Sequence, residues 1–334
     1  MPPDTVRPNL GPFRAGNTGT EGVWQFRGAA EGAAVLVTAL VHGNEPCGAW
    51  ALCRVLEAGL RPQRGTLTLA FCNLEAHDCY DPTRPDEARF LDEDLNRVWG
   101  PSLATGQPAR ERRRARALQP FVEAADWLLD LHSMHEPGLP TVLTGRAASS
   151  QRMTMAAEHL GLPGFIVSDA GHAEGARMRD HGRFRDPPVD ATYGALLVEC
   201  GAHGDPTSRE VAWTAVLRFL DWTEVLPAPE LARSLAEPRQ VLDVTDAVVA
   251  RSTAFQFARP WAHGQRVAHA GTLLGWNDGD PVVTPFDDCV LVMPSLRQLR
   301  PGVTVVRLAR SVTLPTPFPP RLKGCSAVPT DPVS

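Results

Sequence analysis

The feature that most constrains the fold is an apolar run at residues 35–41 that ends in His42-Gly-Asn-Glu45-Pro46. The run is rich in valine and leucine and predicts a buried strand. Glycine and asparagine permit a tight turn, and Pro46 suits the start of a helix at 47–58, where its missing N–H needs no partner. An imidazole and a carboxylate are therefore expected at one strand end. His-x-x-Glu alone is a weak motif, because His42 is equally compatible with an ordinary hydrogen-bonded histidine.

Apolar runs alternate with helical patterns along the first two thirds of the chain. Strands are expected at 34–41, 66–72, 127–131, 141–144, 165–167 and 195–199, and helices at 47–58, 109–125, 150–160 and 207–225. This alternation predicts an α/β domain with a mixed, largely parallel sheet flanked by helices. The stretch 78–105, rich in Asp, Arg and Pro, fits neither period and predicts a long ordered loop, a kind of segment that often carries function.

The pattern changes after a proline-containing linker at 226–230. Short strands are expected from there on, at 241–249, 265–268, 282–285, 290–293 and 303–308. They predict a small all-β domain, with a barrel as one form it could take. The predicted division is an α/β domain at 1–230, a β-rich domain at 231–310 that caps its cleft, and a proline-rich tail at 311–334.

Two other predicted strands end in residues of metal-site or acid–base type. His132 follows the run at 127–131, and Glu199 ends the run at 195–199. Parallel strands that finish at one sheet edge bring their ends together, where open α/β sheets bind ligands. Two histidines and one carboxylate make a catalytic zinc site when a fourth position stays open for water. The sequence therefore predicts one zinc hydrolase centre, with His42, Glu45 and His132 as candidate ligands.

Other clusters are weaker candidates for metal binding. Cys72, His77 and Cys79 lie close enough in the sequence to suggest a second metal site. Because a fourth ligand is missing, a buried core thiol followed by a loop is the better interpretation of this segment. His135 competes with His132 as a ligand, and we expect it to be a loop residue. Asp130, two residues before His132 on the same strand face, is either a buried capping carboxylate or a group that orients a ligand.

Charge and composition exclude several classes of partner. The net charge of −5 and pI near 6.1 give no reason to expect nucleic acid, and the arginine-rich run at 110–116 predicts the solvated start of a helix. Seven cysteines without a Cys-x-x-Cys pair indicate a reducing compartment. No window approaches the ~18 apolar residues of a membrane span, and no signal peptide is recognisable. We expect a soluble cytoplasmic protein that binds neither membrane nor nucleic acid.

Four ordered motifs suggest a family. His42-Gly-Asn-Glu45, Asp94-Leu-Asn96-Arg97, Asp130-Leu-His132 and Val198-Glu199-Cys-Gly201 resemble those of the succinylglutamate desuccinylase/aspartoacylase family, a branch of the zinc carboxypeptidase superfamily. The resemblance covers roughly residues 30–225. It implies a zinc-carboxypeptidase-like fold followed by a β-rich C-terminal domain, which agrees with the patterns above.

The resemblance also implies roles for particular residues. It implies one zinc ion per chain on His42, Glu45 and His132, Glu199 as general acid/base, and Arg89 polarising the scissile carbonyl. Asn96 and Arg97 match a pair that binds a substrate carboxylate. For Arg97, a surface ion pair with Asp92, Glu93 or Asp94 remains an alternative. A second carboxylate-binding arginine is expected some ten residues before Glu199, where Arg183 and Arg185 are both candidates. Aspartoacylases add a tyrosine from the C-terminal domain, but this chain has only Tyr80 and Tyr193.

Three functions remain in competition. The leading hypothesis is a zinc-dependent hydrolase that removes the acyl group from a small carboxylate-bearing N-acyl amino acid or related amide. A zinc metallocarboxypeptidase acting on peptide C-termini would use the same site. A metal-binding sensor or scaffold without catalysis is the alternative of another class. The oligomeric state, including a homo-oligomer, is open.

Overall fold

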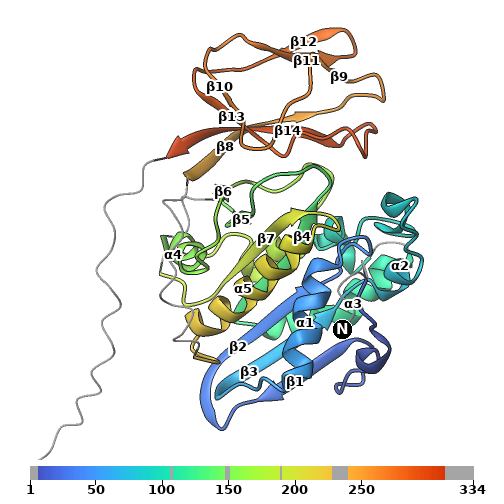
Figure 1. Ribbon diagram of the computed structural model, residues 1–334, viewed down its shortest axis with the longest axis vertical. Helices are drawn as coiled ribbons and strands as arrows, with labels where there is room; N and C mark the ends of the chain where they lie inside the picture. Colours follow the sequence, from blue (N-terminus) through green and yellow to red (C-terminus); the bar gives the residue numbers. More distant parts are fainter. Residues whose placement is uncertain (1–6, 106–107, 147–150, 189, 228–239, 313–334) are drawn as a thin grey trace, which may run out of the picture.

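A computed structural model describes residues 7–105, 108–146, 151–188, 190–227 and 240–312. One sheet of eleven strands runs through the molecule in the order β1-β3-β2-β4-β7-β5-β6-β8-β14-β13-β10, and a second has the order β12-β11-β9 (Figure 1). The strands are β1 Val23–Arg27, β2 Ala30–Ala39, β3 Arg64–Phe71, β4 Trp127–Met134, β5 Thr141–Leu143, β6 Phe165–Ser168, β7 Gly194–Ala202, β8 Gln240–Val249, β9 Gln256–Phe257, β10 Arg266–Val267, β11 Leu273–Asn277, β12 Asp280–Val283, β13 Cys289–Val292 and β14 Thr304–Val312. The helices are α1 Cys47–Glu57, α2 Leu74–Asp78, α3 Arg110–Ala124, α4 Gln151–His159 and α5 Pro206–Trp222.

The central part of the large sheet is parallel. Strands β3, β2, β4 and β7 run in one direction, with β1 antiparallel at the edge and β5 antiparallel to β7. Helices α1, α4 and α5 lie on one face, and α3 lies on the other (Figure 1). The α/β fold class predicted from the sequence is confirmed.

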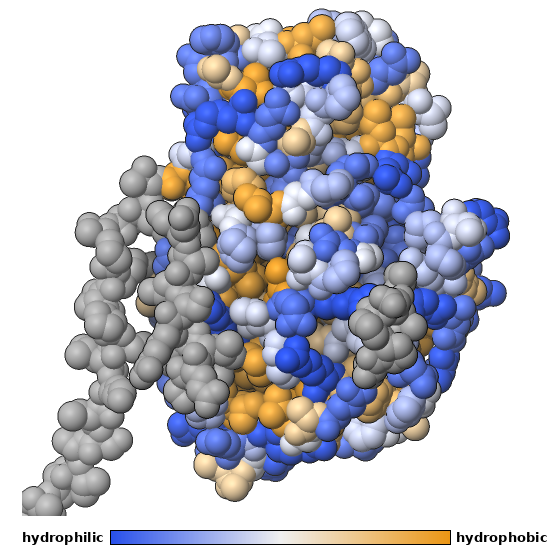
Figure 2. All heavy atoms as spheres, in the orientation of Figure 1, coloured by the Kyte–Doolittle hydropathy of each residue, from blue (hydrophilic) through white to orange (hydrophobic). Residues whose placement is uncertain are grey.

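Residues of one strand pack alternately against these two helical layers. Val35 and Val37 of β2 belong to the apolar cluster that holds α1 and α5, whereas Leu36 packs in the cluster that holds α3. Alternation follows from the two-residue period of a strand, and it explains why the run is apolar throughout. On the face in Figure 2, hydrophilic and hydrophobic residues are mixed, as expected where the apolar sides of helices turn toward the sheet.

The C-terminal strands extend the large sheet. Strand β8 pairs in parallel with β6, and β14, β13 and β10 follow it, while β9, β11 and β12 form the small sheet above them (Figure 1). Strands were predicted here from the sequence, but their addition to the large sheet was not. The pairing of β6 with β8 joins segments that lie far apart in the chain, so no local pattern indicates it. It also missed β1, β9 and β11. Strand β14 reaches Val312, past the start predicted for the tail; residues 228–239 and 313–334 lie outside the described residues.

The long loop after α2 is held by a buried carboxylate. Glu111 at the start of α3 accepts hydrogen bonds from the backbone N–H groups of Leu91, Asp92 and Glu93 at 2.7–3.2 Å. Arg114, one turn further on, donates from Nε to the carbonyl of Cys72. The charges of this segment predicted a solvated helix start. Instead, the start of α3 connects the loop to the end of β3. No helix within the described ranges is long and apolar enough to cross a membrane.

Candidate metal centre

A tight turn carries the chain from β2 into the candidate site. Leu40 has a φ of 58°, a left-handed conformation that is rare for such a side chain. Gly43 packs so closely that a Cβ would lie 2.5 Å from the carbonyl oxygen of Ala88 and 2.5 Å from the backbone nitrogen of His77. Only glycine fits there. The turn thereby fixes the direction in which His42 leaves the strand.

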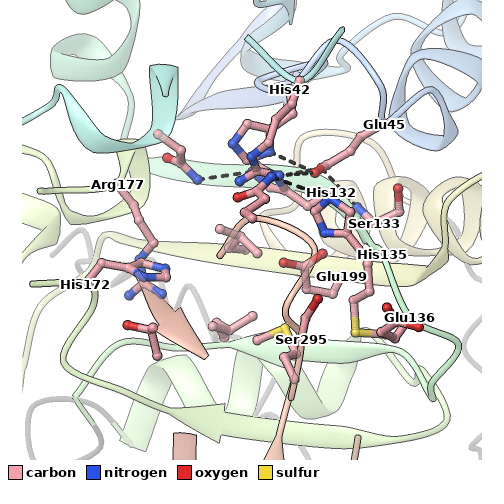
Figure 3. Close-up of a pocket in the computed structure, with 18 of the residues that line it drawn as sticks. His42, Glu45, His132, Ser133, His135, Glu136, His172, Arg177, Glu199 and Ser295 are labelled. Atoms are coloured by element: carbon pink, nitrogen blue, oxygen red, sulfur yellow. Dashed lines mark hydrogen bonds and ion pairs between the residues drawn. The ribbon is translucent and has the colours of Figure 1, made fainter. Parts of the chain in front are cut away.

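Three buried side chains converge beyond this turn (Figure 3). Nδ1 of His42 lies 2.8 Å from one carboxylate oxygen of Glu45, and Nδ1 of His132 lies 2.9 Å from the other. Glu45 precedes α1, and His132 lies in β4, so two chain segments meet here. One ligand atom from each residue lies within 4.8 Å of the others, the only group of at least three candidate metal ligands found in the described residues.

Two aspartates hold the outer sides of the imidazoles. Nε2 of His42 lies 3.0 Å from Asp94, and Nε2 of His132 lies 2.9 Å from Asp130. The second oxygen of Asp130 accepts a 2.7 Å hydrogen bond from Thr38 in β2. A carboxylate on Nε2 keeps the proton there and leaves Nδ1 with a lone pair toward the centre. Asp130 therefore lies where it would orient His132 as a candidate ligand, and Asp94 has the same relation to His42, a contact that sequence reasoning missed.

The charges at this centre fit a cation. Burial alone would lower the pKa of His132, but Asp130 and Glu45 raise it well above its ordinary value. Burial alone would raise the pKa of Glu45, but the neighbouring His42 and His132 hold it well below its usual range. Protonated imidazole thus balances the carboxylates when no metal is bound, and a divalent cation takes the place of such protons. Two nitrogens and one carboxylate are a donor set that zinc accepts.

Glu199 lies beside the three candidate ligands. It stands opposite His132 in the register of β7 with β4, and Figure 3 shows its side chain facing the pocket. Burial raises the pKa of Glu199 to about 8. Its Oε2 atom has no hydrogen-bond partner among the described residues. A carboxyl group with a raised pKa and a free oxygen is suited to taking up and releasing a proton.

Arg89, Asn96 and Arg97 also line the pocket. Arg89 donates to Glu45 at 3.2 Å and to Asp94 at 3.1 Å, so it is tied to the candidate centre. The amide oxygen of Asn96 accepts from the backbone of Met178 at 2.8 Å. Arg97 lies 4.0 Å from Asp94, too far for a hydrogen bond. Of the other partners considered for Arg97, Asp92 accepts from the Arg110 backbone and Glu93 pairs with Arg112.

Arg183 and Arg185 are not brought to this pocket. Arg183 donates to Asp126 at 3.0 Å and to the carbonyl of Ala125, and its guanidinium lies over the ring of Tyr193. Arg185 lines a neighbouring polar cavity, which shares Arg97 and His172 with this pocket. Arg183 lies within the 3₁₀ turn at Gly182–Phe184, and Arg185 directly follows it. This turn directs both side chains away from the ends of β4 and β7. The second basic group of the pocket must come from elsewhere.

Pocket residues that sequence reasoning missed come from two distant segments. His172 and Arg177 lie in the loop after β6, and Figure 3 shows them on the side of the pocket away from His135 and Glu136. The C-terminal strands and their loops supply the wall where a tyrosine was expected: His263, Met293, Pro294, Ser295, Gln298, Val303, Thr304 and Arg307. No local pattern marks these residues, because their approach depends on the long-range pairing of β6 with β8.

The weaker metal candidates have other partners. His77 contacts the carbonyl of Gly43 through Nδ1 at 2.8 Å, and Cys72 is buried, as a core thiol would be. His135 lies just beyond β4, 3.5 Å from Asp86. The six cysteines within the described residues are free.

The fold is of the α/β class, and the buried histidine–glutamate group at its centre could hold a metal ion. Residues 31–186 match the family model of the succinylglutamate desuccinylase/aspartoacylase catalytic domain. This part of the chain therefore belongs to that family, which confirms the resemblance of the motifs. The matched stretch contains His42, Glu45 and His132 but ends before Glu199, so geometry carries the case for that residue.

Solved structures share the fold over most of the chain. Succinylglutamate desuccinylase from Vibrio parahaemolyticus is 17% identical, with 88% of this chain and 87% of that chain covered and a TM-score of 0.65. A succinylglutamate desuccinylase/aspartoacylase from Rhodobacter sphaeroides is 20% identical, with coverages of 87% and 89% and a TM-score of 0.62. The ectoine utilization protein from Ruegeria pomeroyi is 17% identical, with coverages of 86% and 87% and a TM-score of 0.59. A comparison with curated proteins finds no match.

Proposed function

We propose that the protein is a zinc-dependent hydrolase that removes the acyl group from a small carboxylate-bearing N-acyl amino acid or related amide. The observation that carries the proposal is the position of Glu199, which is half-buried beside His132 of the candidate centre and has a buried carboxylate oxygen without a partner among the described residues. The family of residues 31–186 supports deacylation. The free cysteines support the cytoplasm as its location.

The proposed chemistry divides between the cofactor and the chain. His42, Glu45 and His132 would hold a zinc ion, which would supply a Lewis acid for the acyl carbonyl and would acidify the attacking water. Glu199 takes a proton from that water and passes it to the nitrogen of the departing amine, which completes hydrolysis without another acid. Arg89, held by Glu45 and Asp94, directs its charge toward the same carbonyl. Asn96 and Arg97 line the side where a substrate carboxylate is bound.

The test is metal analysis followed by a substrate screen. We expect about one zinc ion per chain after reconstitution, and release of free amine from at least one member of a panel of N-acetyl and N-succinyl amino acids. Hydrolysis of C-terminal residues from blocked dipeptides, without N-acyl amino acid hydrolysis, would instead establish a carboxypeptidase. Zinc binding with neither activity would favour the sensor or scaffold.

Glu199→Gln provides the sharper experiment. We expect this variant to bind zinc as the wild type does and to lose at least ~10²-fold in turnover, because the amide cannot accept the proton. Glu136→Gln is the matched control: Glu136 lines the same pocket but is partly exposed and paired with Arg297 at 3.0 Å. Its turnover should stay within a few-fold of wild type. A Glu199→Gln enzyme with near-normal turnover would remove Glu199 from the mechanism.

A further inference from the structure

The pocket contains four arginines, and two of them already pair with two carboxylates each. Arg89 is neutralised by Glu45 and Asp94. Arg177 makes a two-pronged contact with Asp169, at 2.7 and 2.9 Å, and a third hydrogen bond to Asp180 at 2.6 Å. Carboxylates of the protein therefore balance the charges of these two guanidiniums, and neither adds to the net positive charge of the pocket.

Arg307 of β14 is buried but incompletely paired. Its Nε atom lies 3.5 Å from Asp169, whose two oxygens already accept from Arg177, and it makes no hydrogen bond to any described residue. Its Nη2 atom faces the ring nitrogens of His172 at 2.8 and 3.1 Å. Burial and the charge of Arg307 lower the pKa of His172 well below its ordinary value, so this ring is neutral at neutral pH and accepts from Arg307 without balancing its charge.

The charged groups around Arg307 carry an excess of positive charge. Asp169 and Asp180 are shared by Arg177, Arg179 and Arg307. Two carboxylates thus face three guanidiniums. Since an uncompensated charge away from water is costly, this corner of the pocket is prepared to receive an anion.

Arg97 also lines this pocket, although it lies far from Arg307 in the sequence. Its Nη1 atom donates to the carbonyl of Asn96 at 2.8 Å, but the nearest carboxylates, Asp94 and Glu174, lie 4.0 and 3.9 Å away. Glu174 is engaged more closely by Arg300, at 2.8 Å. Burial and the positive charges of Arg89 and Arg307 lower the pKa of Arg97 to about 10, which leaves it charged at neutral pH.

We infer that Arg307 and Arg97 together bind one carboxylate of the substrate, so that a strand of the C-terminal region selects for negative charge. This inference rests on the proposed function and adds a specificity-determining residue to it. A guanidinium fork binds a carboxylate through two parallel hydrogen bonds, and two forks that repel each other gain most from an anion between them.

The position of Arg307 in the sheet makes the clamp rigid. Arg307 is paired with Val292 of β13 on one side and Ala247 of β8 on the other, so its backbone lies in the interior of the sheet. Asp169 and His172 then limit the directions that the side chain can take. A binding group held on such an element loses little freedom when the ligand arrives.

The experiment compares pairs of ligands that differ by one charge. Isothermal titration calorimetry would measure succinate against succinamate, and N-acetyl-L-aspartate against N-acetyl-L-asparagine, with metal-free and zinc-loaded full-length protein. We expect the wild type to prefer the more anionic member at least ~10-fold, about 1.4 kcal/mol. In Arg307→Gln the preference should fall to within about two-fold. A wild type without this preference, or an Arg307→Gln variant that keeps it, would overturn the inference.

Two further variants separate charge recognition from stability. Arg310→Gln is the matched control, because Arg310 lies three residues further along β14, is exposed and stacks over Phe286; it should keep the full preference. Arg307→Lys keeps the charge but loses the fork, and we expect an intermediate preference. If Arg307→Gln does not fold, as judged by thermal unfolding, the lysine variant decides: a wild-type preference in it would refute the clamp.

Kinetics distinguish a failure of the clamp from a failure of the proposed function. If a substrate is found, Arg307→Gln should raise KM at least ~10-fold with a smaller change in kcat, since the carboxylate lies away from the bond that breaks. Hydrolysis whose KM is insensitive to Arg307 would refute the clamp and leave the hydrolase standing. An Arg307-dependent binding preference without any hydrolysis would support the clamp and refute the hydrolase.

Discussion

At the scale of single residues, the candidate centre depends on which ring nitrogen of each histidine carries the proton. Asp130 and Asp94 each lie at the Nε2 atom of a histidine whose Nδ1 atom faces Glu45. That His42, Glu45 and His132 lie together could be predicted from the sequence, because they follow apolar runs at strand ends. The partner of His42 could not, because Asp94 reaches it from a loop fifty residues away.

We predict that Asp130→Asn weakens zinc binding by ~10- to 100-fold, the usual scale for losing a group that orients a metal ligand. The new amide can present its NH₂ group to Nε2 of His132, which moves the ring proton to Nδ1, the atom that faces Glu45. Competition with a chromophoric chelator would measure the affinity. Asp126→Asn is the control: Asp126 lies on the same segment but accepts from the backbone of Ala34. Unchanged zinc affinity in Asp130→Asn would show that Asp130 does not orient the ligand.

At the scale of elements, strands and helices were predictable where the side-chain pattern is local. The runs before His42, His132 and Glu199 are apolar because both faces of these strands are covered, and their positions in β2, β4 and β7 follow from that. Strand β1 was missed because only one of its five residues is buried. The loop between α2 and α3 was predicted, but its anchor Glu111 was not, because its partners are backbone groups.

Helix α2 supports a prediction about pH, because it carries the buried His77 against the turn that contains Gly43. Burial lowers the pKa of His77 to about 4, below the ordinary value of 6.5. The unfolded chain therefore binds more protons between pH 6.5 and 4. The contribution of His77 to stability is complete above pH 6.5 and is lost as the pH falls toward 4, with a slope of up to about 1.4 kcal/mol per pH unit.

Urea unfolding at pH 7, 6 and 5 would measure this slope. His77→Gln should be less stable at pH 7 but should lose less stability than wild type on acidification, since glutamine does not titrate. His269→Gln, in an exposed loop, should retain the wild-type slope. Equal slopes for wild type and His77→Gln would show that His77 does not contribute to acid sensitivity.

At the scale of the whole molecule, an apolar cluster joins the two regions of the chain. Leu143, Val167 and Leu197 of the α/β region pack with Leu242 and Val290 of the C-terminal strands. The sequence predicted two domains because composition and period change near residue 230, and nothing local revealed the β6–β8 pairing. For the same reason it could not place Arg307, which depends on that pairing to reach the pocket.

This shared cluster predicts that the α/β region and the C-terminal strands unfold together. Leu242 is fully buried and stands opposite Val167 across the β6–β8 pairing. Leu242→Ala should therefore cost 2–5 kcal/mol, the range for such truncations in a core, and should lower the midpoint of a single calorimetric transition. Val283→Ala, at an exposed position of the small sheet, should change stability by no more than about 0.5 kcal/mol. Two resolved transitions, of which Leu242→Ala shifts only one, would instead mean that the C-terminal strands fold independently. The pocket wall that bears Arg307 could then separate from the candidate metal centre.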